Sequence, residues 1–371
     1  MIEQTIALFI DAYRDLNARK LFWITLILSG VFIAAFALLG ADPKGFHLLW
    51  FHWDMPMARY LYKQIFSYLV VGLWLTFVSA TLALVSTAGI FPDLISTGAI
   101  DLYLSKPLSR PRLFLTKYMS GLLFVTLQVA LVAVGGFILL GVRGGEWKPG
   151  LLLAIPIVVC FFSYLFAISV FLGILTRSSI AALLLAVLCW GFFWAVHKTD
   201  QFLSKELASQ DYLANYYRDE IHSADARLGE LHASTRPADR MAVVDLTEQR
   251  ASDQERLETV EAGLPATRRT HRIVYAIYSA VPKTTETTDV LDRTLFSNDE
   301  VAEGDEKTTS MFVRSTGNRD FDAQRNAAMQ GEAGYHREIR GRSLFWIIGT
   351  SLTFEAVVLL LAGWVFCRRD Y

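Results

Sequence analysis

Six stretches of the chain are apolar and long enough to cross a lipid bilayer, and this constrains the fold more than any other feature. They are Leu21–Gly40, Ile65–Ile90, Tyr118–Val142, Leu151–Leu175, Ser178–Val196 and Leu344–Phe366. A span needs about 20 apolar residues to cross roughly 30 Å of hydrocarbon. Because no backbone polar group can stay unpaired there, each span is expected to be an α-helix. The sequence therefore predicts an all-α polytopic membrane protein with six transmembrane helices.

Charge is concentrated in one part of the chain. Residues 198–343 carry 20 basic and 26 acidic side chains, although only 19% of the whole chain is charged. We therefore expect a membrane domain over residues 1–197, with an interfacial N-terminal helix and five spans. A large, mainly helical extracytoplasmic insert follows over 198–343. Residues 344–371 supply the sixth span and a cytoplasmic tail.

The distribution of lysine and arginine in the short loops predicts the orientation. With the N-terminus inside, the inner segments hold ten basic residues and the short outer loops hold five. Basic residues favour the cytoplasmic side, whereas long domains cross largely regardless of charge. Both ends are therefore expected inside, with the insert outside. The amphipathic stretch Ile2–Leu16 is expected to lie along the inner membrane surface.

The insert begins with a heptad pattern that predicts a long helix over Lys198–Ala233. The seam residues are Leu203, Leu207, Gln210, Ala214, Tyr217, Ile221, Ala224, Leu228 and Leu231. A weaker seam over Asp239–Glu261 predicts a second helix, so that the two form a hairpin. Ile273–Pro282 is too short to span and is expected to be a separate interfacial helix. Residues 297–335 are polar and rich in glycine, which favours loop structure.

The loop between the second and third spans, residues 91–117, combines a short apolar helix with a basic collar. Leu102 and Leu104 belong to its apolar side, and Pro107 is expected to end the helix. Ser109 can then cap the next helix, which has Pro111 near its first turn. A short rigid helix between two spans is a surface on which another protein could act.

A resemblance to a known family rests on this loop. Gly98, Asp101, the run Leu104–Arg110 (Leu-Ser-Lys-Pro-Leu-Ser-Arg) and Lys117 resemble the coupling-helix region of ABC-2 type exporter permeases. The run contains Ser105, Lys106, Pro107, Ser109 and Arg110. The amphipathic N-terminus, Pro282-Lys283-Thr284 and the C-terminal Arg368-Arg369-Asp370-Tyr371 are also similar to that family. The enlarged connection between spans five and six departs from its compact members.

The resemblance implies a permease that pairs with a second copy or a second permease and works with two ATPase subunits. The coupling helix would pass the ATPase motion to the spans of the bacterial cytoplasmic membrane. The sequence contains no Gly-x-x-x-x-Gly-Lys-Ser/Thr phosphate loop. ATP is therefore expected on a partner subunit, and this chain is expected to be no enzyme and to need no cofactor. Lipid and an extracytoplasmic protein are the other expected partners, and nucleic acid is not one.

Glu355 is the one charged residue within a predicted span. A lone carboxylate in hydrocarbon costs about 3 kcal/mol unless it is paired or wetted. It is expected to face a neighbouring helix or a water-filled path, with Gln128 of the third span as a polar partner. A role in translocation and a purely structural hydrogen bond both fit this pattern.

The first outer loop contains His47, His52, Asp54, Met55 and Met57. Such donors suit copper or zinc, but the five-residue spacing of the histidines does not align them on a helix. The neighbouring tryptophans and phenylalanine fit an interfacial aromatic belt better. No metal site is therefore expected.

Three classes of function fit these features. The first is the permease half of an ATP-driven exporter. The second has the same architecture but drives an extracytoplasmic partner mechanically without moving a solute. The third is an intramembrane enzyme or a passive scaffold, for which the sequence offers no catalytic pattern. An ATPase encoded beside this chain would favour the first two.

Overall fold

The computed structural model describes residues 14, 20–42, 45–48, 51–54, 58–96, 109–145, 147–232, 239–295 and 317–369. Apart from Arg14, the predicted interfacial helix at the N-terminus lies outside these residues. So does most of the predicted coupling segment: Gly98, Asp101, Leu102, Leu104, Ser105, Lys106 and Pro107.

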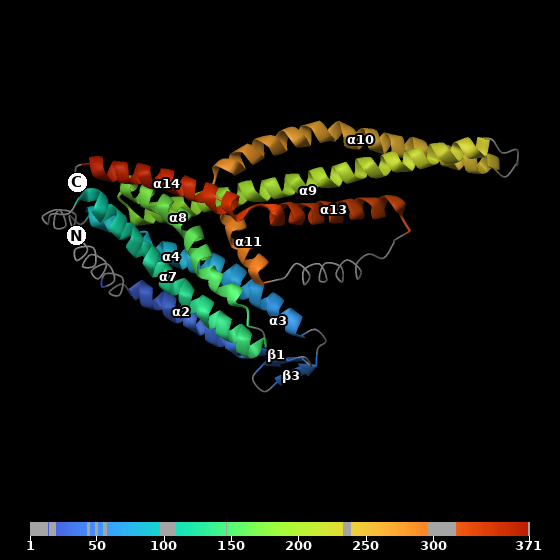
Figure 1. Ribbon diagram of the computed structural model, residues 1–371. Helices are drawn as coiled ribbons and strands as arrows, with labels where there is room; N and C mark the ends of the chain where they lie inside the picture. Colours follow the sequence, from blue (N-terminus) through green and yellow to red (C-terminus); the bar gives the residue numbers. More distant parts are fainter. Residues whose placement is uncertain are drawn as a thin grey trace. The chain divides into compact units, whose positions relative to one another are not determined.

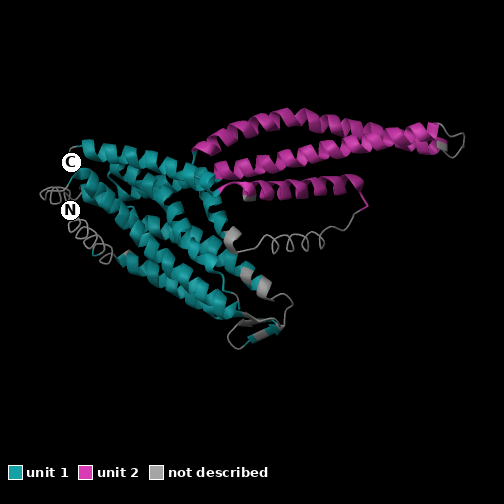
Figure 2. Ribbon diagram, viewed as in Figure 1, with its two compact units in different colours: residues 1–194, 281–301, 344–371 teal, residues 195–280, 302–343 magenta. Residues whose placement is uncertain are grey.

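The chain divides into two compact units (Figure 2). The first comprises residues 1–194, 281–301 and 344–371, and the second comprises 195–280 and 302–343. The sequence assigns 281–301 to the insert, whereas the structure groups them with the apolar helices. The reason lies in their packing: Thr284, Glu286 and Thr287 are buried, and the backbone N–H of Lys283 donates to Ser351 Oγ at 2.9 Å.

Within the described residues, five helical segments are long and apolar enough to cross a membrane. They are Gln64–Ile95, Arg110–Arg143, Pro149–Thr176, Ser179–His232 and Leu344–Arg368. The first predicted span corresponds to a shorter helix, α2 (Lys20–Ala37), with an apolar stretch over Phe22–Ala37. It is shorter than predicted because the chain becomes a β-strand at Leu39.

The segment Gln64–Ile95 changes its helical type along its length. It contains the end of α3 (Ala58–Phe66), the π-helix η1 (Ser67–Val78), α4 (Ser79–Thr87) and all but the last residue of α5 (Ile90–Ser96). The wider turn shows at Ser79, whose N–H donates to the carbonyl of Trp74 five residues back. Such π-helical turns occur often at functional sites.

The first unit also contains a three-stranded antiparallel sheet where the sequence suggested only a loop with an aromatic belt. β1 (Leu39–Asp42) pairs with β2 (Gly45–Leu48), and β2 pairs with β3 (Phe51–Asp54). Phe51 and Trp53 both expose more than half of their surface. Because side chains two apart on a strand share one face, these two rings form an apolar strip. His47 and His52 are register partners in the backbone ladder.

The helices around the core of the first unit are α7 (Arg110–Arg143), α8 (Ala154–Thr176) after the 3₁₀ turn η2 (Pro149–Leu153), α11 (Thr284–Leu295) and α14 (Leu344–Arg368). Figure 1 shows α7, α8 and α14 running through this unit. Aromatic rings fill the space between these helices: Phe91, Phe114 and Phe366 pack together. The ring of Tyr118 stacks on Phe166 at 5.1 Å.

The described part of the second unit contains three helices rather than the two of the predicted hairpin. It consists of α9 (Ser179–His232) from Ala195 onward, α10 (Asp239–Ala280) and α13 (Arg319–Gly341). The heptad prediction is confirmed where Ala214, Tyr217 and Ile221 are buried with Leu257 of α10. The expected separate helix at 273–282 is wrong, because Ile273–Ala280 are the last turns of α10.

The loop prediction for 297–335 is wrong over the part that the structure describes. Residues 319–335 belong to α13, and Asn318 caps this helix by accepting from the N–H groups of Asp320 and Phe321. Its buried positions recur every four residues. They are Ala323, Ala327, Gly331, Tyr335 and Ile339. The small residues bring α13 close to α9: a Cβ added at Gly331 would lie 2.6 Å from the carbonyl oxygen of Lys205.

Ion pairs join the three helices of the second unit. Lys205 of α9 contacts Glu332 of α13 at 2.6 Å, and Arg218 of α9 contacts Glu261 of α10 at 2.6 Å. Arg319 of α13 pairs with Asp253 of α10, whose side chain is only 1% exposed. Asp253 interrupts the predicted seam of α10 because it is the acceptor for α13.

Candidate functional site

Glu355 lies in the middle of α14 and is buried, with 7% of its surface exposed. Its two carboxylate oxygens have separate donors on two other helices. The hydroxyl of Tyr118 on α7 donates to Oε1 at 2.7 Å, and the hydroxyl of Ser163 on α8 donates to Oε2 at 2.7 Å. We call these three residues the Glu355 cluster.

The Glu355 cluster connects three helices through polar contacts at the level of the middle of α14. Polar side chains that bond across helices stabilise packing where the surroundings are lipid. The Tyr118 hydroxyl also lies 3.2 Å from the carbonyl oxygen of Ser163, so the cluster includes the backbone of α8. A carboxylate held this way fixes the mutual register of α7, α8 and α14.

Gln128 is not the partner of Glu355, which corrects the expectation from the sequence. Its side chain is fully buried, and its Nε2 lies 3.5 Å from both the carbonyl and the hydroxyl oxygen of Ser79 on α4. Gln128 is ten residues beyond Tyr118 on α7, which places it about 15 Å further along that helix. The two polar residues therefore belong to different levels of the helix bundle.

A second set of polar contacts lies at the end of the bundle where α7 begins and where α8 and α14 end. We call it the basic end. Ser109 takes the N-cap position of α7 with extended backbone, and Pro111 lies in the first turn, as predicted. The Ser109 side chain makes no capping bond. Arg110 instead donates through Nη1 to the carbonyl oxygens of Cys367 at 3.2 Å and Arg369 at 2.8 Å.

Arg369 makes the same kind of contact with α8. Its Nη1 donates to the carbonyl oxygen of Ile174 at 2.9 Å and lies 3.5 Å from that of Leu175. The last carbonyl groups of a helix have no partner within it, so a cation there satisfies them and complements the helix dipole. Arg110 and Arg369, here named the arginine clasp, thus connect α7 to α14 and α14 to α8.

The same end contains the only non-glycine residue with positive φ among those that the structure describes. Arg177 adopts φ 53° and ψ 23° as it ends α8, and its N–H donates to the carbonyl of Gly173. A left-handed residue at this position closes a helix and reverses the chain. It allows α9 to start at Ser179, only two residues later.

Sequence reasoning identified Glu355 and Arg110 but missed Tyr118, Ser163 and Arg369 as their partners. Tyr118 follows Lys117 at the predicted start of a span, where an amphipathic ring is ordinary. The available signal was the coincidence of polar residues at similar depth in three predicted helices. Serines are common in transmembrane helices, however, so that signal does not select Ser163.

No cluster of metal ligands occurs among the residues that the structure describes. Comparison of the chain with protein-family models, with curated proteins and with solved structures finds no match.

Proposed function

We propose that this chain is the permease subunit of an ATP-driven exporter of the ABC-2 type. In this proposal it is dimeric, lies in the bacterial cytoplasmic membrane and takes its energy from a separate ATPase. α2 is the first of six spans, both chain ends are cytoplasmic, and the second unit is extracytoplasmic. The ATPase contacts the loop over residues 91–117.

The arginine clasp is the observation that carries this proposal. The loop re-enters the bundle at Ser109, and the next residue, Arg110, holds the end of α14. Arg369 then holds the end of α8. A push on the loop would therefore act on three helices together. Deeper in the bundle, the Glu355 cluster joins the same three helices.

The proposal is tested by purifying the chain from native membranes and identifying its partners by mass. A co-purifying ATPase is expected with the wild-type chain. Lys106→Glu and Leu104→Asp, both in the loop, are expected to lose it. Arg143→Glu is the matched control, because it reverses a charge at the opposite end of α7. An ATPase that stays bound to both loop variants would contradict the proposal.

The second candidate is a mechanical transducer that drives an extracytoplasmic partner. Ion pairs between α9 and α10 favour it, because they join the two long helices so that both would move together. Arg250 of α10 pairs with Asp225 of α9, and Arg218 of α9 pairs with Glu261 of α10. Replacing residues 226–249 with a short Gly-Ser linker ends α9 at Asp225 and begins α10 at Arg250, its ion-pair partner. If the shortened chain restores the phenotype of a null strain, the exporter is favoured. If it binds the ATPase but fails to restore the phenotype, the transducer is favoured.

A further inference from the structure

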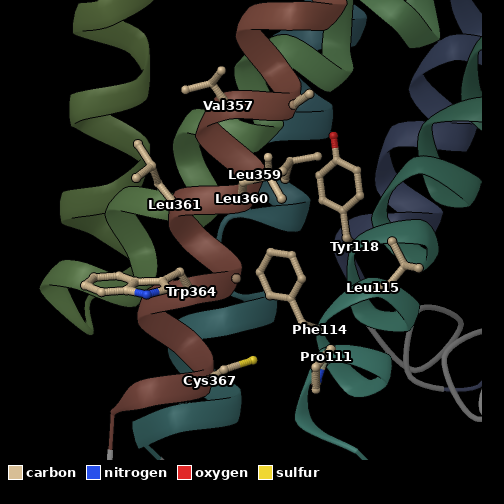
Figure 3. A pocket seen from close by; sticks show the side chains of 12 residues that line it. Pro111, Phe114, Leu115, Tyr118, Val357, Leu359, Leu360, Leu361, Trp364 and Cys367 are labelled. Carbon is tan, nitrogen blue, oxygen red and sulfur yellow. The ribbon is translucent and has the colours of Figure 1, made fainter.

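A long apolar groove runs between α7 and α14 (Figure 3). Pro111, Phe114, Leu115 and Tyr118 form one wall, and residues of α14 from Ala356 to Cys367 form the other. Its volume is about 1020 Å³, whereas ligand pockets typically measure about 300–1,000 Å³. The groove can therefore hold a molecule of considerable size.

The length of the groove matches one leaflet of a bilayer. The stretch of α14 from Val357 to Cys367 rises about 15 Å, which is half of the roughly 30 Å hydrocarbon core. The groove begins at the basic end and stops near the Glu355 cluster, since Tyr118 lines it with its ring. On the α14 wall the groove is open to the surroundings: Leu360 is 73% and Trp364 56% exposed.

A cation lies beside one of the side chains that line the groove. The guanidinium of Arg368 is 4.8 Å from the ring centroid of Trp364, one of the lining residues. Unlike Arg110 and Arg369, Arg368 is exposed. Arginine is well suited to phosphate because its planar fork presents several donors. A fatty chain in the groove would thus end beside a phosphate ligand.

We propose that this groove binds an anionic phospholipid of the leaflet that contacts the basic end. An acyl chain lies along α7 and α14, and the phosphate contacts Arg368. A second copy of the chain is a poorer occupant, because its apolar helices would bring no phosphate to Arg368. The bound lipid fills the space between α7 and α14. The arginine clasp joins these two helices at the basic end, and the Glu355 cluster joins them near the middle of α14.

The test uses a photo-crosslinking residue at Leu360 in the full-length chain. Leu360 is replaced by p-benzoylphenylalanine, and the protein is reconstituted into vesicles of equal parts phosphatidylglycerol and phosphatidylcholine. Leu188 of α9 is the matched control, because it is 68% exposed and does not line the groove. After illumination, adducts are identified by mass and by gel mobility.

At Leu360 we expect a phosphatidylglycerol adduct in about fivefold excess over phosphatidylcholine, the preference that one basic residue near the surface provides. At Leu188 the two lipids should react equally. Arg368→Gln should abolish the excess at Leu360 while lipid adducts persist. Equal reaction of the two lipids at Leu360 would overturn the proposal, as would no adduct there. A cross-link between two copies of the chain would identify the groove as a subunit interface and also overturn it.

Discussion

At the scale of single residues, two buried carboxylates have opposite surroundings. Glu355 accepts from two neutral hydroxyl groups within the helix bundle of the first unit. Asp253 of the second unit is paired with the guanidinium of Arg319. In each case the acid lies on one helix and its donors lie on others, so removing a donor should affect packing between helices rather than one helix alone.

The Glu355 cluster predicts coupling between Tyr118 and Glu355. Tyr118→Phe removes one donor and should lower the free energy of unfolding by about 1 kcal/mol. In a Glu355→Leu background the same change should cost less, because only the longer bond to the Ser163 carbonyl remains to be lost. Unfolding of the detergent-solubilised chain measures both values. Tyr68→Phe is the control, because this side chain is 74% exposed. It should leave the free energy of unfolding unchanged in both backgrounds. Equal costs in the two backgrounds would refute the cluster.

The Asp253–Arg319 pair predicts a larger effect. Arg319→Ala leaves a buried carboxylate without its cation and should cost roughly 3 kcal/mol. Amide hydrogen exchange over residues 319–341 measures this as faster opening of α13. Arg268→Ala is the control, because its partner Asp211 is half exposed, and it should cost less than about 1 kcal/mol. Similar effects of the two changes would argue against burial as the cause.

At the scale of elements, α13 shows how small residues can conceal a helix in the sequence. Its buried face consists of alanines, one glycine, a tyrosine and an isoleucine, so hydropathy alone shows no apolar stripe. Gly331 and Gly334 resemble loop signals, yet at Gly331 the backbone of α13 lies so close to α9 that a Cβ would meet the carbonyl oxygen of Lys205. The close approach depends on another helix, which a single-sequence pattern does not reveal.

The two glycines predict opposite effects of alanine. At Gly331 a new Cβ would meet the backbone of Lys205, so Gly331→Ala should destabilise α13 by about 1–3 kcal/mol. At Gly334 the nearest atom would be the Cβ of Ala208 at 3.7 Å, an ordinary contact. Gly334→Ala should therefore stabilise the helix by up to about 1 kcal/mol through propensity. The rate of tryptic cleavage at Arg325 and Arg337 reports both. Faster cleavage in both variants would be inconsistent with this packing.

The apolar helices were the easiest elements to predict, because their length and composition follow from the bilayer itself. At the basic end, the first residue of α7 and the last residue of α14 were predicted to within a few residues. The partners of Glu355 were not, since the angle at which three helices face each other is set by packing. The sheet over 39–54 was also missed, because its strands are only four residues each.

At the scale of the whole molecule, the chain leaves the first unit at Ala195, returns for 281–301, and enters it again at Leu344. The return includes α11, whose first residues are buried among the apolar helices. The second unit is therefore an insertion with two separate chain segments. Each crossing point is a place where the proposed topology can be tested.

The proposed orientation predicts which residues a membrane-impermeant maleimide reaches. In a background without Cys160, Cys189 and Cys367, Gly229→Cys should react in intact cells; an added Cβ at this exposed glycine has open space. Gly98→Cys should react only after the membrane is permeabilised. The reverse pattern would place the loop over 91–117 outside and end the case for an intracellular ATPase contact.

The arginine clasp has a consequence for how this chain tolerates mutation. Its four acceptors are main-chain carbonyl oxygens, at Ile174, Leu175, Cys367 and Arg369. Side chains at the first three can change freely without removing an acceptor, because every peptide unit carries one. Side-chain changes therefore remove these contacts only at the two donors, Arg110 and Arg369. Lysine in place of either arginine keeps the charge but lacks the rigid planar guanidinium that aims Nη1 at both oxygens.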